Sequence, residues 1–336
     1  MRKFLSVFLP VLFCFSLMAV PVEAQTSRPK ILYVDSYSPD FAWVRDIMKG
    51  MARGFGVYYK GDHFDDSRSD VDLEVFHMDT KTHQSEEYKK DAALRAKRFI
   101  DAWQPDILII SDDNAAKYLV VPYLMDSSLP ILFCGINWDA GPYGFPNEHI
   151  TGMVEVTLVP QTLAILQKYA QGSRIGVLGS DTLTERKNVE HYQKIFDVQF
   201  HQIEFAEDFL ELKGKFSMMQ ENNDILLLLE MQSVKGFDNE EMKRFVQQNT
   251  KIITGSMDTF LAPYVVVSCA KKGQEQGEWV AQKALEILQG KSPSDIPLAR
   301  NKEAKILLNM HLAQKLGIKF SMDLITRAEF VNGPDH

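Results

Sequence analysis

Polar and acidic side chains stand directly after several short apolar runs of this 336-residue chain. Ser111 and Asp112 follow one run, and Asn137 and Trp138 follow the next. Carboxylates, hydroxyls, amides and an indole ring can hold a small ligand by charge, hydrogen bonds and stacking. Because parallel strands bind ligands at their carboxyl ends, we expect these residues to lie side by side at one rim. The alternative is that Ser111 and Asp112 only cap the next helix.

A βαβ unit surrounds these residues. The apolar runs 107–110 and 131–134 are separated by an amphipathic segment of helical length at 115–125. Runs that are apolar throughout indicate strands buried on both faces of a parallel sheet. The same alternation continues along the chain and begins again after Thr151-Gly152. We therefore predict an α/β protein with two doubly wound parallel-sheet lobes whose rims face each other across a cleft.

The strand exits and the adjoining helix starts supply the candidate ligand-binding residues. In the first lobe they are Ser36, Tyr37, Trp43, Ser111, Asp112, Asn137 and Trp138. In the second lobe they are Ser180, Asp181, Glu230, Met231 and Asp258. Free N–H groups at helix starts favour an anion, whereas acidic side chains favour a cation.

Together these features indicate a zwitterion, such as an amino acid or a short peptide. Tyr37, Trp43 or Trp138 would stack on an aromatic part of it, or their rings simply cover the core. The other alternative is that Asp112 and Asp258 serve only as helix caps.

The sequence contains no catalytic signature. It lacks a Walker loop, a Gly-x-Ser-x-Gly elbow and a metalloprotease helix, and its eight histidines form no evident nucleophile–base pair. The acidic segment 62–66 lacks the spacing and the terminal Glu of a calcium loop, so we interpret it as a solvated loop. We predict a binding protein without cofactor or metal, with an enzyme on the same frame as the minor alternative.

The net charge of −8 and the pI near 5.6 disfavour nucleic acid and anionic membrane surfaces as partners. The remaining candidate for a partner in the cleft is therefore a small molecule.

The N-terminus has the pattern of a secretory signal peptide. Two basic residues precede an apolar core at 4–20, and Val22-Glu23-Ala24 forms a small-residue cleavage signal. We predict cleavage after Ala24 and a periplasmic mature protein; an uncleaved anchor is the alternative. Export leaves Cys134 and Cys269, which we interpret as buried thiols, with a disulfide between them as the alternative.

The C-terminal third carries a family resemblance. After an amphipathic stretch from Lys272, the chain reads Gly290-Lys291-Ser292-Pro293-Ser294-Asp295-Ile296-Pro297. This resembles the late helix and the Gly-Lys-x-Pro-x-x-Ile-Pro turn of periplasmic type I substrate-binding proteins. The closing segment 306–328 resembles the tail of the tryptophan/tyrosine-type branch of the ABC transporter substrate-binding family. Ser111-Asp112, Gly135-Ile136-Asn137 and Thr151-Gly152 also fit that family's rim and hinge.

The resemblance implies a type I fold, in which three crossovers form a hinge between the lobes. The first lobe would comprise residues 29–150 with about 271–300, and the second 152–269 with about 302–333. The hinge crossings are expected near Thr151-Gly152, Cys269-Ala270 and Ala299-Arg300.

The resemblance also implies a monomeric, exported solute-binding protein that closes on a small ligand and delivers it to the membrane permease of an ABC transporter. The segment 35–43 is closer to the extracytoplasmic sensor portion of bacterial signalling proteins. The alternative function is therefore a ligand-sensing partner of a membrane signalling receptor.

Overall fold

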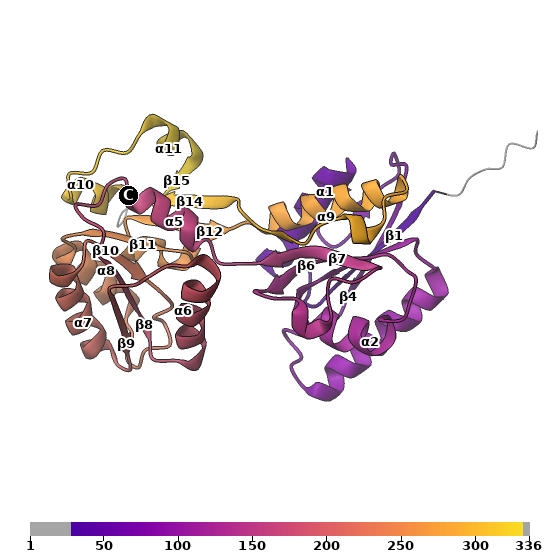
Figure 1. Ribbon diagram of the computed structural model, residues 1–336, viewed down its shortest axis with the longest axis horizontal. Helices are drawn as coiled ribbons and strands as arrows, with labels where there is room; N and C mark the ends of the chain where they lie inside the picture. The colour runs from indigo at the N-terminus through magenta and orange to yellow at the C-terminus, as the bar shows by residue number, and fades with distance from the viewer. Residues whose placement is uncertain (1–27, 332–336) are drawn as a thin grey trace, which may run out of the picture.

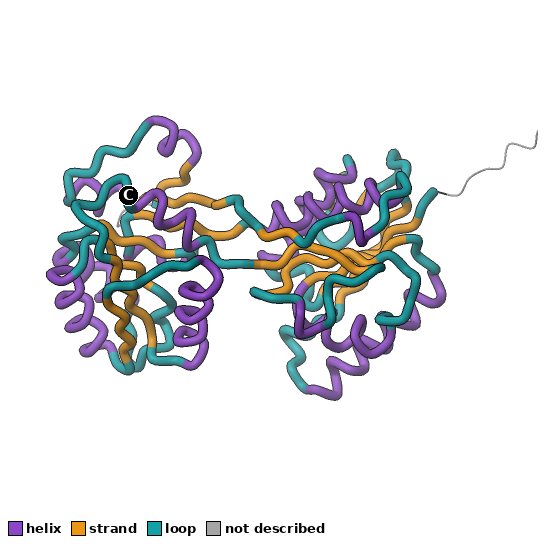
Figure 2. The backbone as a smooth tube through the Cα atoms, in the orientation of Figure 1, coloured by secondary structure: helices purple, strands orange, loops and turns teal. Residues whose placement is uncertain are grey.

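Two α/β lobes joined by a narrow waist make up the computed structural model, which describes residues 28–331 (Figure 1). Each lobe has its own sheet with helices on both faces (Figure 2), so the predicted fold class is confirmed. The predicted signal peptide, residues 1–24, lies outside the described residues.

The first lobe is built on a six-stranded parallel sheet in the order β13-β7-β6-β5-β1-β4. Its strands are β1 (Lys30–Asp35), β4 (Asp72–His77), β5 (Ile107–Ser111), β6 (Ile131–Asn137), β7 (Ile150–Glu155) and β13 (Ala299–Arg300). Its helices are α1 (Ala42–Phe55), α2 (Glu86–Trp103), α3 (Asp112–Ala115), the π-helix η1 (Ala116–Val120), α4 (Val121–Tyr123), α9 (Gly273–Leu288) and the 3₁₀ helices η2 (Gly141–Tyr143) and η4 (Pro293–Asp295). A small hairpin, β2 (Tyr58–Tyr59) with β3 (Phe64–Asp65), follows α1.

The central strands of this sheet are buried on both faces, as their unbroken apolar character predicts. All five residues of β5 are buried, and successive residues enter different cores. Leu108 joins the core under α2 and η1, whereas Ile107 joins the core under α1 and α9. The single helix expected at 115–125 is instead divided into η1 and α4, with α3 before them.

Helices α1 and α9 pack unusually closely because glycines line their contact. A Cβ atom on Gly277 would lie 1.9 Å from the backbone oxygen of Ile47, and one on Gly50 would lie 2.1 Å from the backbone oxygen of Gln274. Neither distance allows a side chain. This contact fixes α9, which is distant in sequence, to the first lobe.

The second lobe has a seven-stranded sheet in the order β15-β14-β12-β11-β10-β8-β9, in which only the β12–β14 pair is antiparallel. Its strands are β8 (Ile175–Ser180), β9 (Gln202–Ala206), β10 (Ile225–Leu228), β11 (Ile253–Ser256), β12 (Val267–Lys271), β14 (Ala304–Leu308) and β15 (Ala328–Phe330). Its helices are α5 (Val159–Leu166), α6 (Leu183–Phe196), α7 (Phe209–Asn222), α8 (Asn239–Asn249), the 3₁₀ helix η3 (Thr259–Tyr264), α10 (Met310–Lys315) and α11 (Met322–Arg327). Helices α5 and α6 cover one face of the sheet, and α7 and α8 cover the other.

The two cysteines of the described chain are buried, unpaired thiols. Cys134 lies in the first-lobe core under α1 and α9, and Cys269 lies in the second-lobe core under α5. The prediction of buried thiols is confirmed, and the disulfide alternative is wrong because the thiols belong to the cores of different lobes.

Three crossovers form the waist, each a few residues later than predicted. Thr151-Gly152 lies inside β7, and the chain leaves the first sheet only after Glu155. Cys269-Ala270 lies inside β12 and Ala299-Arg300 forms β13, so those crossings follow at 272 and at 301–303. The predicted crossings fall inside strands because the local sequence does not separate the end of a strand from the start of a crossover.

Side chains tie the crossovers to one another. The Val156 N–H donates to Asn301 Oδ1 at 2.7 Å, and Asn301 Nδ2 donates to the Val156 carbonyl at 3.0 Å. The carboxylate of Glu275, near the start of α9, accepts the backbone N–H groups of Lys302 and Glu303, both at 2.7 Å. These bonds hold the crossovers as a unit at the base of the interlobe space.

Candidate functional site

A cavity of about 350 Å³ opens between the lobes at the carboxyl ends of the strands. The first lobe and the first crossover contribute Asn137, Trp138, Glu155, Thr157 and Leu158. The second lobe contributes Thr184, Glu185, Asn188, Tyr192, Leu229, Met257, Asp258 and Lys271. Of the predicted residues, Asn137, Trp138 and Asp258 line this cavity.

Trp138 reaches from the first lobe onto helix α6 of the second. Its ring stacks on His191, with centroids 5.1 Å apart and planes 9° from parallel, and it also contacts Tyr192. The backbone of Trp138 has a φ of 62°, in the left-handed region that a bulky residue seldom adopts. The indole packs against the cores of both lobes, which makes Trp138 both a cavity wall and a contact between the lobes.

An ion pair crosses the base of the cavity. Lys271, the last residue of β12, donates its Nζ to Glu155, the last residue of β7. The Glu155 side chain is 7% exposed, and its burial raises the pKa of this carboxyl even though Lys271 acts in the opposite direction. Lys271 Nζ also lies 5.7 Å from the centroid of the Trp43 ring, so it links the cavity to the first-lobe rim.

The second-lobe wall carries carboxyl groups that have no cationic partner within residues 28–331. Glu185, in the first turn of α6, accepts a hydrogen bond from Asn188 Nδ2 at 3.1 Å. Burial, followed by the charges of Asp258 and Glu230, raises the pKa of Glu185 to about 7. Burial also raises the pKa of Asp258, although the charge of Lys271 acts in the opposite direction. This wall therefore holds carboxyl groups in surroundings that disfavour their charged form.

Three predicted residues of the first lobe, Ser36, Ser111 and Asp112, lie in a buried polar cluster next to Trp43. Ser36 Oγ donates to the Ser111 carbonyl at 2.7 Å, and Ser111 Oγ pairs with the Tyr33 hydroxyl at 2.8 Å. Both serines are fully buried. Their hydroxyls connect β1 to β5 and do not reach the cavity.

Asp112 is buried within this cluster. Its Oδ1 accepts the Trp43 indole N–H at 3.0 Å, and its Oδ2 is buried without a hydrogen-bond partner. Burial, and then the charges of Glu155 and Asp35, raise the pKa of Asp112 well above its ordinary range. Its φ of 67° turns the side chain toward Gly135, where any Cβ would lie 2.9 Å from Oδ1.

Neither Asp112 nor Asp258 caps a helix with its side chain, so the capping alternative is wrong for both. Ser111 occupies the N-cap position of α3 without a side-chain cap hydrogen bond. Asp258 occupies the N-cap position of η3, and it also makes no side-chain cap hydrogen bond. The carboxyl of Asp258 is instead free to face the cavity.

The other predicted residues have different surroundings. The half-buried Tyr37 packs on Phe41, with Lys81 Nζ 5.4 Å from its ring centroid. Met231 is fully buried in the core under α7 and α8 and does not line the cavity, so its role as a ligand contact stays a prediction. Asp181 is exposed and pairs with Arg186 at 2.7 Å.

Ser180 and Glu230 lie next to the cavity but do not line it. Ser180 Oγ donates to Glu230 Oε2 at 2.8 Å, and Glu230 also accepts Ser233 Oγ and the Ser233 N–H. These bonds fix the Glu230 carboxylate at the exit of β10, where its charge acts on Glu185 and Asp258.

Sequence reasoning missed Glu155 of the first lobe and most of the second-lobe wall. Glu155 and Lys271 each end an apolar run, which is the signal used for the other candidates, so they could have been found. Glu185, Asn188 and Tyr192 project from one side of α6. No local pattern distinguishes that side from an ordinary helix surface.

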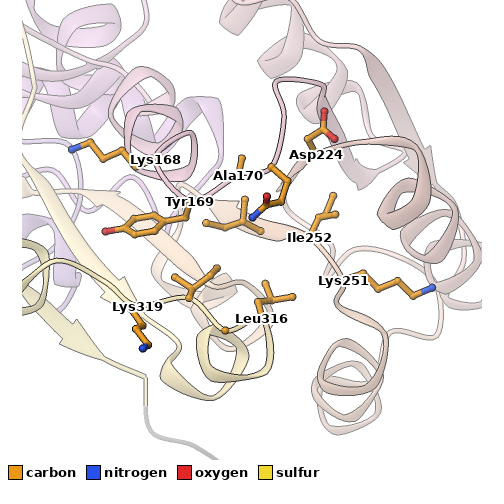
Figure 3. Close-up of a pocket in the computed structure, with 12 residues that line it drawn as sticks. Lys168, Tyr169, Ala170, Asp224, Lys251, Ile252, Leu316 and Lys319 are labelled. Atoms are coloured by element: carbon orange, nitrogen blue, oxygen red, sulfur yellow. The ribbon is translucent and has the colours of Figure 1, made fainter.

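A second cavity, of about 330 Å³, lies on the second lobe beside Asp224 and Ile252, which precede β10 and β11 (Figure 3). The apolar side chains of Ile252 and Leu316 lie in its middle, and Lys168, Lys251 and Lys319 extend outward in different directions. Ammonium groups that diverge cannot hold one anion together. This cavity also lies at the amino ends of the strands, the opposite edge from the interlobe cavity.

The interlobe cavity presents groups suited to binding a small polar molecule. Residues 28–331 contain no group of three His, Cys, Asp or Glu side chains arranged to hold a metal. Lining groups offer one ammonium, several carboxyls, amide and hydroxyl groups, and two aromatic rings. Such a set recognises a small polar molecule by charge, hydrogen bonds and stacking.

Comparison with known protein families gives a match over residues 56–332 to the family described as "ABC transporter substrate binding protein". The chain belongs to this family. Its members bind substrates and are not a class of enzymes, so a solute-binding role follows, and members are typically exported. No helix within residues 28–331 is both long and apolar enough to span a membrane. No curated protein matches the chain.

Solved structures share the fold of this substrate-binding protein. The ligand-free, open structure of CD0873, a substrate-binding protein with adhesive properties from Clostridium difficile, gives a TM-score of 0.68 at 15% identity, covering 90% of this chain and 99% of that one. An ABC domain in complex with L-Trp from Streptococcus pneumonia gives 0.53 at 16% identity, with 91% and 100% covered. AraP, an arabinose-binding protein from Geobacillus stearothermophilus, gives 0.53 at 12% identity, with 86% and 99% covered.

Proposed function

We propose that this exported substrate-binding protein holds a small zwitterionic solute, such as an amino acid or a short peptide, between its lobes and delivers it to the permease of an ABC transporter. The observation that carries the proposal is the interlobe cavity, where Lys271, unpaired carboxyl groups and aromatic rings converge. The family match supports delivery to a transporter, since it is defined by ABC substrate binding.

Each part of a zwitterion has a counterpart in the cavity. A solute ammonium would face Asp258 and Glu185, which lack cationic partners within residues 28–331. A solute carboxylate would share Lys271 with Glu155, at the end of the cavity where α5 also begins. An aromatic or apolar part would lie against Trp138 and Tyr192.

We further propose that the solute brings the lobes together. Closure about the crossovers would carry the first-lobe rim, including Tyr37 and Trp43, toward Asp258. The solute stabilises the closed form only to the extent that it binds that form more tightly than the open one. In this proposal Asp112 acts through Trp43, whose indole it orients, and does not contact the solute.

A metabolite library screened by thermal shift tests the proposal. A solute at 100 times its dissociation constant adds about 2.7 kcal/mol to the free energy of unfolding, which gives a clear shift. Asp258→Asn should abolish the shift, because it removes a cavity charge. Asp181→Asn is the matched control, since Asp181 also follows a strand of this lobe but pairs with Arg186 outside the cavity. If Asp258→Asn leaves the shift unchanged, the cavity is not the binding site.

Delivery is tested separately by uptake. Membrane vesicles carrying the host's cognate permease should import the labelled solute only when the loaded protein is added. Binding without any effect on uptake would instead favour the sensing alternative.

A further inference from the structure

We propose that Glu185 and Asp258 form the subsite for the cationic group of the solute, and that Glu185 releases a proton when that group binds. This inference rests on the proposed function and adds to it a proton release at Glu185 and a dependence on pH. It makes Glu185 a specificity-determining residue of the cavity.

The position of Glu185 supports this role. It lies in the first turn of α6, lines the cavity and is only 7% exposed. One carboxyl oxygen accepts the Asn188 amide, and no lysine, arginine or histidine within residues 28–331 forms an ion pair with it. A buried carboxylate without a cationic partner is costly, so the free protein keeps this group partly protonated.

The groups on the elements packed around Glu185 either raise its pKa further or leave it unpaired. Asp258 at the exit of β11 and Glu230 at the exit of β10 are acidic, and both raise the pKa of Glu185. Tyr192, two turns further along α6, is neutral, and burial and then Glu185 raise its pKa further. Among residues 28–331, Lys271 is the single cation lining the cavity; it donates to Glu155, and its charge also opposes the rise in the pKa of Asp258.

The rings in the cavity wall provide an independent reason for a cation. Trp138 and Tyr192 line the same cavity as Glu185 and contact each other at 5.7 Å between centroids. Aromatic faces attract ammonium and guanidinium groups, and more strongly where water is excluded. Carboxyl groups beside aromatic faces therefore select a ligand that is cationic as well as partly apolar.

The protonation step is balanced without any further reactant. The solute enters with its ammonium already charged, the Glu185 carboxyl loses its proton to the solvent, and the carboxylate pairs with the ammonium. Because the pKa of free Glu185 is about 7, linkage predicts release of about half a proton per solute at pH 7. The dissociation constant should then be about tenfold larger at pH 6 than at pH 8.

The experiment uses two probe sets and three proteins. The probes are the twenty common amino acids and their N-acetyl derivatives, which keep the carboxylate and side chain but lose the cation. The proteins are the wild type, Glu185→Gln, and Glu190→Gln, which changes an exposed glutamate on the same helix. Glutamine can still accept the Asn188 hydrogen bond, so Glu185→Gln should fold.

Calorimetry of any amino acid that binds, repeated in buffers of different ionisation enthalpy, counts the released protons. The inference expects proton release and the tenfold pH effect in wild type and Glu190→Gln, and neither in Glu185→Gln. It also expects at least tenfold weaker binding of the N-acetyl derivative.

Binding without proton release would overturn the inference while the proposed function stands. Equal binding of the N-acetyl derivative would overturn both, because the proposed zwitterion binds through its ammonium. If no probe from either set binds, the proposed amino-acid ligand is wrong and this inference is wrong with it.

Discussion

Replacing Lys271 by Met should weaken the junction between the lobes in a way that depends on pH. Lys271 is the last residue of the second-lobe strand β12, and it donates to Glu155 at the end of the first-lobe strand β7. The Glu155 side chain is 7% exposed and that of Lys271 is 36% exposed. The substitution removes the ammonium and leaves a buried carboxyl without its partner.

The expected loss can be bounded. Breaking a fully buried pair costs about 3–5 kcal/mol, but Lys271 is more than one-third exposed, so water screens part of its interaction. We therefore expect a coupling energy of about 1–2 kcal/mol between Lys271→Met and Glu155→Gln in a double-mutant cycle. The double variant should recover most of the loss, because the glutamine no longer carries a buried charge.

The pH dependence has a defined sign. The pKa of Glu155 is raised in the folded protein, chiefly by burial, and Lys271 limits that rise. When a carboxyl has a higher pKa in the folded than in the unfolded protein, the protein loses stability as pH increases through the folded-state pKa. Without Lys271 the pKa rises further, so the deficit of Lys271→Met should be larger at pH 8 than at pH 5.

Urea unfolding followed by tryptophan fluorescence, at both pH values, measures this prediction. Lys272→Met is the matched control, because Lys272 pairs at 3.4 Å with Glu303, whose side chain is 63% exposed. It should change the free energy of unfolding by less than about 0.5 kcal/mol. Equal losses in the two variants, or a Lys271→Met deficit that does not depend on pH, would refute this account of the pair.

Three further predictions concern packing, a buried acid and processing. Gly277→Ala should lower the free energy of unfolding by about 3 kcal/mol, because the new Cβ would meet the Ile47 carbonyl. Gly214→Ala, in an open part of α7, should instead raise the free energy of unfolding by about 0.5–1 kcal/mol. Equal effects of the two substitutions in urea unfolding would contradict the close contact of α1 with α9. Asp112→Asn should stabilise the protein increasingly from pH 5 to pH 8, and by about 1–2 kcal/mol at pH 8. The reason is that the raised pKa of Asp112 makes its charged form costly in the folded protein. A loss of stability at pH 8 would show that the charge is needed. Intact mass of the secreted protein should correspond to a chain beginning at Gln25, and a mass that includes residues 1–24 would rule out the predicted cleavage.

The fold could be predicted because its signals are local. Strands buried on both faces must be apolar throughout, and each is followed by polar residues where the chain leaves the sheet. This placed the residues after β5 and β6 at one rim, and Asn137 Nδ2 does donate to Asp113 Oδ2 at 2.6 Å. The prediction of a shared rim is correct at the level of the backbone.

The direction of individual side chains at that rim could not be predicted. Asp112 adopts a φ of 67° and is buried inside the first lobe, while Trp138, with a φ of 62°, packs against both lobes and stacks on His191 of α6. In the sequence the two residues look equivalent, because each lies just after a predicted strand. Which one reaches the ligand depends on backbone conformations that neither residue type favours.

The pairing of residues from different lobes at the waist also could not be predicted from the sequence. Glu155 and Lys271 are neighbours only because two crossovers bring the ends of β7 and β12 together. The side of α6 that carries Glu185 faces the cavity because of how the lobes are joined, which no helical periodicity records. Local pattern therefore gives the strand exits, and the arrangement of the lobes decides which exits form the site.

Small-angle scattering with and without solute tests the central claim most directly. The solute would be the compound that gives the largest thermal shift in the wild type and none in Asp258→Asn. Closure of the lobes around the cavity that holds Trp138, Glu185 and Asp258 predicts a smaller radius of gyration in the saturated protein. An unchanged radius of gyration at saturation would contradict closure on a solute bound between the lobes.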